Sequence, residues 1–199
     1  MPTLLAVEVS PRSDRSISRK LTSLFVDQWR ANHADGHVVV RDLAKHQPPY
    51  VDLPWIGGAF ALPEQHSPES DMAIAVSNEL VSELQAADHI VIGTPMYNFS
   101  IPAVLKAWVD HVVRVGVTVS PDNVGLLTGK KATVIIATGG DFSPGSPVAG
   151  YNQASGYLRQ VLGWIGITDV EIILANRARA GGEGETAVEA FGDAVTAAA

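Results

Sequence analysis

Five short apolar runs, rich in β-branched residues, recur along this chain and alternate with longer segments of helical spacing. The runs cover residues 3–9, 37–41, 89–93, 133–137 and 170–174. Continuous apolar runs of this length are typical of strands buried on both faces of a sheet. Because strands that alternate with helices pair in parallel, the pattern predicts an α/β fold with a doubly wound, five-stranded parallel sheet and helices on both faces.

The intervening segments carry the marks of helices. We expect helices at about 16–31, from Ser67 onward, after Pro102, at about 151–164 and from Glu185 to the end of the chain. Ser67 followed by Pro68 is a typical helix start. The Gly-rich stretch 181–186 contains no Lys and two acids, so we interpret it as a turn before the last helix.

The segment 47–67 contains four prolines and two glycines and is predicted to be a long loop. It also holds Trp55 and Phe60, which favours a rim or lid over a pocket. A plain surface excursion is the alternative.

Composition narrows the class of protein. A chain of 199 residues predicts one domain, residues 1–199. Its net charge of -7 and its lack of a basic run argue against a nucleic-acid binder. There is no cysteine, hence no disulfide or thiolate site. The first residues lack a basic segment and a long apolar run, so we expect neither a signal peptide nor a membrane span, and a cytoplasmic protein.

Ligands of open α/β sheets bind beyond the carboxyl ends of the strands, which directs attention to the loops after the first, third and fourth strands. The first loop, 10–18, leads into a helix N-terminus and carries the hydroxyls of Ser10, Ser16 and Ser18. Amides and hydroxyls there favour a phosphate. Simple helix capping by Ser13 or Asp14 is equally consistent with the spacing. The loop lacks both G-x-G-x-x-G and G-x-x-x-x-G-K-[ST], the usual nucleotide motifs.

The residues of the other two loops favour binding of a flat, ring-shaped ligand. In 93–102, prolines stiffen a loop whose Met96, Tyr97 and Phe99 offer flat or polarisable surfaces and whose Asn98 offers polar contacts. In 137–142, Gly139 and Gly140 allow the backbone to approach a ligand closely. Aromatic packing and a tight turn are the alternatives. A phosphate and a ring at one sheet edge together fit flavin mononucleotide, FMN.

Three other kinds of site are poorly supported. His33 and His37 stand four residues apart, but Asp35 and Gly36 between them indicate a turn, so we expect no metal site. We interpret His111 as a surface or dimer-contact residue rather than a catalytic base. No G-x-S-x-G hydrolase motif occurs.

The segments 93–110 and 162–170 resemble the FMN-dependent NADH-azoreductase family of flavodoxin-like quinone reductases. The resemblance implies strand order 2-1-3-4-5 and a homodimer with one FMN per subunit and active sites at the interface. It also implies NADH as electron donor, and two-electron quinone reduction and azo cleavage by a ping-pong route through flavin N5.

The same resemblance assigns the site residues. The phosphate would lie at Ser10, Ser16, Ile17 and Ser18, the ring beside Pro95, Met96, Tyr97, Asn98 and Phe99, and the ring's polar edge at Thr138, Gly139 and Gly140. Asn98 and Phe99 would position the reactants, and Trp55, Phe60 and Phe142 would line the substrate pocket. No protein acid is required. Thr138, where the family has an arginine-containing loop, and Val119, where an aromatic is common, bear on the substrate range.

Two other classes of protein remain possible on this fold. A flavodoxin-type carrier would bind FMN, stabilise a semiquinone and pass single electrons to protein partners. A flavin-free interaction domain would not bind FMN at all.

Overall fold

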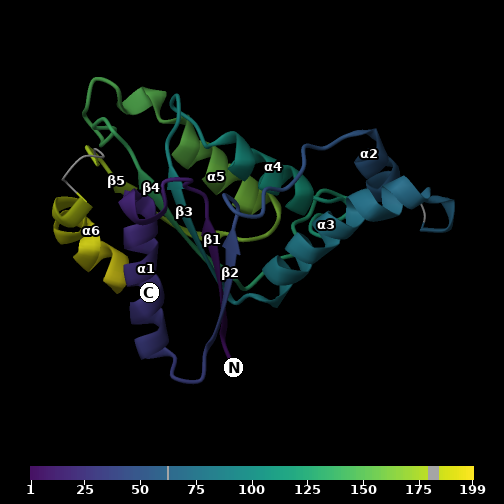
Figure 1. The fold of residues 1–199 in the computed structure, drawn as a ribbon, viewed down its shortest axis with the longest axis horizontal. Helices are drawn as coiled ribbons and strands as arrows, with labels where there is room; N and C mark the ends of the chain where they lie inside the picture. Colours follow the sequence, from purple (N-terminus) through teal and green to yellow (C-terminus); the bar gives the residue numbers. More distant parts are fainter. Residues whose placement is uncertain (62, 179–183) are drawn as a thin grey trace.

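The five strands form one parallel sheet in the computed structural model, which describes residues 1–61, 63–178 and 184–199 (Figure 1). The order across the sheet is β2-β1-β3-β4-β5. Fold class and strand order are therefore as predicted, and the strand ends agree with the predicted runs to within two residues. Their bounds are Thr3–Glu8 for β1, His37–Asp42 for β2, His89–Pro95 for β3, Lys131–Ala137 for β4 and Asp169–Ala175 for β5.

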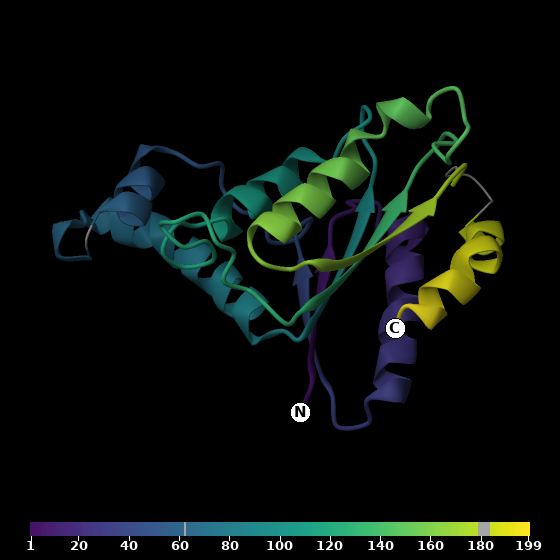
Figure 2. The ribbon, with the colours of Figure 1, turned by 180° about the vertical axis from the view of Figure 1, so that it is seen from behind.

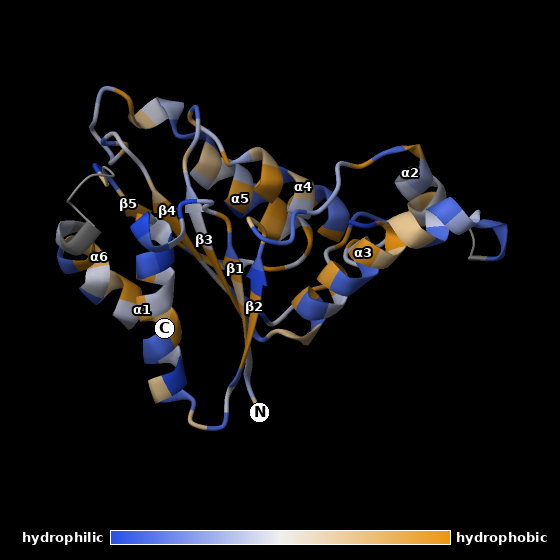
Figure 3. Cartoon of the chain, viewed as in Figure 1, coloured by the Kyte–Doolittle hydropathy of each residue, from blue (hydrophilic) through white to orange (hydrophobic). Residues whose placement is uncertain are grey.

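Helices cover both faces of this sheet, as Figures 1 and 2 show. One face carries α1 (Ile17–Asn32) and α6 (Gly184–Ala197), and the other carries α3 (Pro68–Ala86), α4 (Ala103–Val112) and α5 (Gln153–Trp164). Alternate residues of β1 point to opposite faces, so Leu4 packs with Phe25 of α1, whereas Leu5 belongs to the core shared with Leu84 and Trp108. The strands are accordingly mostly apolar, and the helices are two-sided (Figure 3).

α1 approaches the sheet unusually closely at Gly93 of β3. A Cβ atom at this position would lie 2.0 Å from Oγ1 of Thr22. Thr22 is fully buried, and its hydroxyl donates to the carbonyl oxygen of Ser18 at 2.8 Å. The absence of a side chain at Gly93 therefore sets how deeply the first turns of α1 sit on the sheet.

The prediction of a loop throughout 47–67 is wrong, because the segment contains α2 (Leu53–Phe60) and a short 3-10 helix, η2 (Pro63–Gln65). Asp52 caps α2 by accepting from the amide of Trp55 at 3.0 Å, and Pro54 stands in its first turn. Gly58 lets α2 pack against α3, because a Cβ there would lie 2.8 Å from the carbonyl oxygen of Ser70. This tertiary contact outweighs the poor helix propensity of glycine.

Two further expectations concern the turn before the last helix and the possibility of a membrane-spanning helix. The predicted turn at 181–186 lies mostly outside the described residues, and α6 begins at Gly184. Among the described residues, no helix combines the length and apolar character needed to cross a membrane.

Substituting Gly93→Ala tests the close approach of α1. We expect the free energy of unfolding to fall by about 1–3 kcal/mol, because the added methyl group overlaps Thr22. Urea denaturation measures the change. Gly156→Ala in α5 is the matched control, because a Cβ there meets nothing within 4 Å, and helix propensity should make it neutral or stabilising. Equal stability of Gly93→Ala and the wild type would contradict this account.

Candidate active site

An open pocket of about 400 Å³ lies at the carboxyl ends of the strands. It brings together predicted residues from the three separate loops: Ser10, Ser16, Ile17, Ser18, Pro95, Met96, Tyr97 and Gly139. Arg12, Ala137 and Ala178 also line it, although the sequence analysis did not select them. Ala178 follows β5, and examining the loop after every parallel strand would have included it.

Three buried serine hydroxyls form one end of the pocket. Ser10, Ser16 and Ser18 are each at most 3% exposed, and the hydroxyls of Ser16 and Ser18 lie 3.1 Å apart. Ser16, rather than Ser13 or Asp14, caps α1 by accepting from the amide of Arg19 at 3.4 Å. The amides of Ile17 and Ser18 open the helix and so have no acceptor one turn earlier within it. Capping and anion binding are therefore compatible here.

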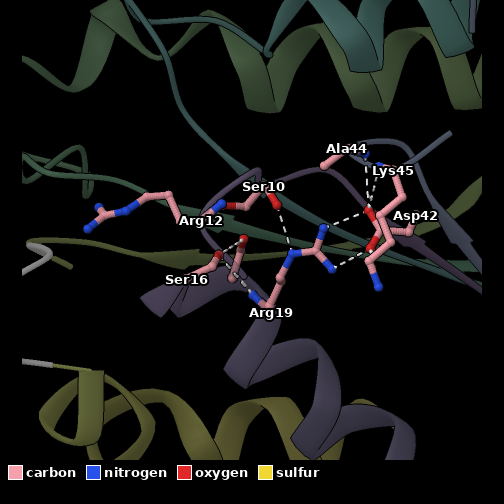
Figure 4. Close-up of polar contacts among 8 residues, drawn as sticks. Ser10, Arg12, Ser16, Arg19, Asp42, Ala44 and Lys45 are labelled. Atoms are coloured by element: carbon pink, nitrogen blue, oxygen red, sulfur yellow. Dashed lines mark hydrogen bonds and ion pairs between the residues drawn. The ribbon is translucent and has the colours of Figure 1, made fainter. Parts of the chain in front are cut away.

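Arg19 fixes the loop that carries Ser10 (Figure 4). Its Nε donates to the carbonyl oxygen of Ser10 at 2.7 Å, and its two terminal nitrogens donate to both carboxylate oxygens of Asp42 at 2.9 and 2.7 Å. Asp42 also accepts from the amides of Ala44 and Lys45. Burial opposes ionisation of Asp42, but these bonds outweigh it and hold the pKa of Asp42 below its ordinary value. No sequence signal pointed to the pair of Arg19 and Asp42. Through Arg19, it connects the loop after β1 to the end of β2.

A strained turn forms the other end of the pocket. Tyr97 and Ser100 exchange both backbone hydrogen bonds, at 2.9 and 3.0 Å. Asn98 and Phe99 between them have φ values of 47° and 71°, in the left-handed region that disfavours side chains. The carbonyl oxygen of Phe99 accepts from the amide of Gln153, the first residue of α5, at 2.9 Å. Surrounding bonds therefore impose this conformation on the two predicted positioning residues.

Phe99 belongs to an exposed aromatic cluster beside the turn. Its ring lies 6.3 Å from the ring of Phe142, edge to face, and 5.5 Å from the ring of Tyr151. Phe99 and Tyr151 are 50% and 57% exposed. The structure thus unites Phe99 with the predicted pocket residue Phe142, whereas Tyr151 was expected only as the start of a helix.

In the third loop, residues 137–142, the polar side chains form hydrogen bonds that stabilise the loop itself. Thr138 is buried, and its hydroxyl contacts the carbonyl oxygen of Gly140 at 2.8 Å and Oδ1 of Asn176 at 3.1 Å. Gly139 is the exposed member and lines the pocket. Arg177, after β5, donates to Asp141 at 2.8 Å. A guanidinium therefore does lie beside this loop, but it comes from the following strand's loop.

The remaining predicted residues lie elsewhere in the subunit. Trp55 is buried on α2, edge to face with His111 at 5.8 Å, and Phe60 is 71% exposed at the end of α2. Figures 1 and 2 place α2 at the end of the molecule opposite α6. The expectation that His111 is a surface or dimer-contact residue is wrong, because it is fully buried within one subunit and its Nε2 lies 2.9 Å from the carbonyl oxygen of Pro49. Val119 is buried in the core.

Comparisons with known proteins agree with this geometry. A model of the flavodoxin-like fold matches residues 2–198. The chain is 51% identical over 191 residues to FMN-dependent NADH:quinone oxidoreductase 2 of Jannaschia sp. strain CCS1, which covers 96% of this chain and 94% of the relative. The chain belongs to this flavodoxin-like quinone oxidoreductase family.

Other members of the family and their structures are also close. FMN-dependent NADH:quinone oxidoreductase 8 of Burkholderia lata is 48% identical over 185 residues, covering 93% of this chain and 88% of the relative. The crystal structure of azoreductase from Bacillus anthracis Sterne superposes with a TM-score of 0.87 at 30% identity, covering 100% of this chain and 99% of that one.

The pocket offers matching chemistry for both parts of the cofactor named in these relatives. Buried hydroxyls and the first amides of α1 suit a phosphate dianion. Met96 and Tyr97 provide a polarisable and an aromatic surface for a flat ring, and both line the same pocket. The residues present therefore fit FMN.

Two substitutions at Phe99 separate backbone strain from loss of the ring. Phe99→Gly and Phe99→Ala both remove the ring, but only glycine relieves the cost of a φ of 71°. We expect the glycine variant to be more stable by about 0.5–1 kcal/mol, measured by urea denaturation. The same pair at Ser100, which lacks a positive φ, should show the opposite order. The same order at both positions would rule out strain at Phe99.

Proposed function

We propose that this protein is an FMN-dependent oxidoreductase that uses NADH to reduce quinones by two electrons and to cleave azo bonds. The observation that carries the proposal is one pocket lined both by the serine cradle, which consists of Ser10, Ser16 and Ser18, and by the turn after β3. The 51% identity to an FMN-dependent NADH:quinone oxidoreductase supports the same activity. Residues 1–199 would act as one FMN-binding domain, in the cytoplasm, where NADH is available.

The serine cradle holds the FMN phosphate in this proposal. Ser10, Ser16 and Ser18 supply hydroxyls, and the amides of Ile17 and Ser18 supply donors at the positive end of the helix dipole. Arg12 lies exposed on the rim, and its side chain points away from the Arg19–Asp42 pair (Figure 4). Arg19 acts indirectly, because its bond to the Ser10 carbonyl fixes the loop.

The turn after β3 and the third loop hold the ring. Pro95, Met96 and Tyr97 line the pocket and would flank the ring, and Gly139 would let the backbone come close to it. Asn98, the next residue of the turn, would supply polar contacts. Thr138 and Gly140 contribute by holding the third loop in place. When bound, FMN supplies the hydride chemistry, accepting two electrons from NADH and passing them to the acceptor.

The donor and the acceptor would bind in turn at the open side of the pocket, beside the ring. Phe99, Phe142 and Tyr151 would form an aromatic wall for a nicotinamide, a quinone or an aromatic azo compound, because their rings cluster on the loops that continue from the pocket-lining residues Tyr97 and Gly139. One shared place for donor and acceptor gives a ping-pong order. No side chain of this chain needs to act as an acid, because solvent reaches the open pocket.

The active form is a homodimer with active sites at the interface. Apolar side chains exposed after α4 and on α5 support this, namely Val115, Val124, Leu126 and Trp164. A dimer also gives Phe60 a role, because its place on α2 lets it reach only the pocket of a partner subunit, whereas buried Trp55 would support α2 from within.

Anaerobic stopped-flow absorbance tests the activity. FMN-loaded protein mixed with NADH should lose its flavin absorbance rapidly, because NADH donates two electrons at once, and added benzoquinone should restore it fully. Both steps should be at least as fast as steady-state turnover. Bleaching too slow for turnover, or a persistent one-electron species, would instead favour a flavodoxin-type electron carrier. Failure to bind FMN would exclude both.

Substituting Trp164→Glu tests the dimer. A charge at a side chain that is 48% exposed should be harmless in a monomer but should weaken an apolar subunit contact. We expect sedimentation equilibrium to show a dimer for the wild type and at least a tenfold weaker dimer for the variant. Val40→Glu on the edge strand β2 is the control, because Val40 is 58% exposed away from α5. A monomeric wild type would refute the proposed dimer.

A further inference from the structure

Two carboxyl groups stand side by side beneath the first turns of α1. Glu8 of β1 is in register with Asp42 of β2 and with Gly93 of β3. Residues in register on neighbouring strands project to the same face, and this face is the one that α1 covers. Glu8 and Asp42 therefore both point toward Arg19.

Arg19 satisfies only one of these two groups. Both terminal nitrogens of its guanidinium bond to Asp42, and its Nε bonds to the Ser10 carbonyl. Glu8 is 9% exposed, and its Oε2 has no hydrogen-bond partner among the described residues. The group of three side chains carries one net negative charge when Glu8 is ionised and none when Glu8 is protonated.

A cavity of about 500 Å³ gives Glu8 a route for proton exchange that does not pass through the FMN pocket. Ser13, Asp14, Lys20, Ser23 and Lys45 complete its lining with Arg19. The charged groups that face Glu8 are Arg19 and Lys20 from α1, Asp14 from the loop before it, and Asp42 and Lys45 from the end of β2. Asp14, Lys20 and Lys45 are exposed, so water screens them far more than it screens Arg19 and Asp42.

The serine cradle is connected to this group of side chains through the backbone of Ser10. Ser10 follows Glu8 by two residues, and Arg19 contacts both the Ser10 carbonyl and Asp42. Glu8 does not line the pocket itself, but a phosphate dianion in the cradle would be linked through the Ser10 loop and Arg19 to a poorly solvated carboxylate whose neighbouring cation is already paired. Ionised Glu8 opposes the binding of that phosphate, whereas protonated Glu8 does not.

We propose that Glu8 is a proton-linked positioning residue for the cofactor: FMN binds preferentially to the form with protonated Glu8, and binding of its phosphate draws a proton onto Glu8. The inference rests on the proposed phosphate position at Ser10, Ser16 and Ser18. Linkage is reciprocal, so protonation strengthens FMN binding by the factor by which FMN strengthens protonation.

The titration of Glu8 falls where this linkage matters. Burial raises the pKa of Glu8 to about 7, although Arg19 acts to lower it and Asp42 adds to the rise. The affinity of the wild type for FMN, relative to that of a protein without this charge, is therefore expected to fall as the pH rises through 7. A carboxyl whose pKa is higher in the folded state destabilises the fold once the unfolded chain can ionise it, so the stability of the FMN-free protein should decline from about pH 4.5 to about pH 7 and level off above that.

Glu8→Gln keeps the size of the side chain and removes its charge. We expect the wild type to bind FMN roughly three- to tenfold more weakly at pH 8 than Glu8→Gln does, and the two to bind equally at pH 6. Fluorescence titration measures the dissociation constants. Comparing the proteins at each pH cancels the titration of the phosphate itself. Isothermal titration at pH 7, in two buffers of different ionisation enthalpy, should show more protons taken up per FMN bound by the wild type than by Glu8→Gln.

Three controls make the outcome decisive. Glu171→Gln neutralises a strand glutamate near Lys131, at the opposite end of the sheet, and should match the wild type. Riboflavin lacks the phosphate, so its affinity should not distinguish wild type from Glu8→Gln. Thermal unfolding without FMN should be cooperative for Glu8→Gln, which confirms that the variant folds. The variant should also lose less stability than the wild type between pH 6 and pH 8.

Each other result overturns the inference at an identifiable step. If FMN binds but Glu8→Gln and the wild type share one pH profile, Glu8 is not linked to binding. If riboflavin shows the same difference as FMN, Glu8 responds to the ring and the assigned link to the phosphate is wrong. If FMN does not bind at all, the proposed function fails, and this inference fails with it.

Discussion

The contact between α1 and the sheet at Gly93 determines the geometry of the whole site. Because no side chain separates Thr22 from β3, the first turns of α1 lie directly on the sheet. Ser16 and Ser18, at the start of that helix, are thereby brought beside Ser10 and opposite Met96 and Tyr97 at the end of β3. A wider spacing would separate the serine cradle from the ring-binding turn, and the two halves of one ligand could no longer be held together.

Between α1 and the sheet, the same close packing encloses the charged side chains of Glu8, Asp42 and Arg19. Asp42, Glu8 and Gly93 are in register, so the strand position that lets Thr22 approach the sheet lies in line with the two carboxyl groups that face Arg19. Arg19 uses its hydrogen bonds on Asp42 and on the Ser10 carbonyl. Arg19 thus fixes the Ser10 loop, whereas Oε2 of Glu8 has no hydrogen-bond partner within the described part of the chain, and its burial makes ionisation of Glu8 costly.

At the end of the pocket formed by the turn after β3, the backbone is strained at Asn98 and Phe99. Asn98 and Phe99 hold left-handed conformations because the bonds between Tyr97 and Ser100 and the bond from Gln153 to Phe99 leave no relaxed alternative. The strain places Phe99 beside Phe142 and Tyr151, which come from segments over forty residues away. The backbone that carries Phe99 is therefore already held in place by hydrogen bonds within the subunit.

The sequence by itself determined the α/β class, the positions of all five strands and the three loops that meet at the pocket, because buried parallel strands and helix starts are local patterns. The helix within 47–67 was missed since its glycines matter only against α3. Only the tertiary structure decided that Ser16 caps α1, that Thr138 faces inward and that α2, with Trp55 and Phe60, lies away from the pocket of its own subunit. It alone decided that Arg19, Asp42 and Glu8 meet, because their contacts join residues distant in sequence through the register of neighbouring strands, which no local pattern encodes.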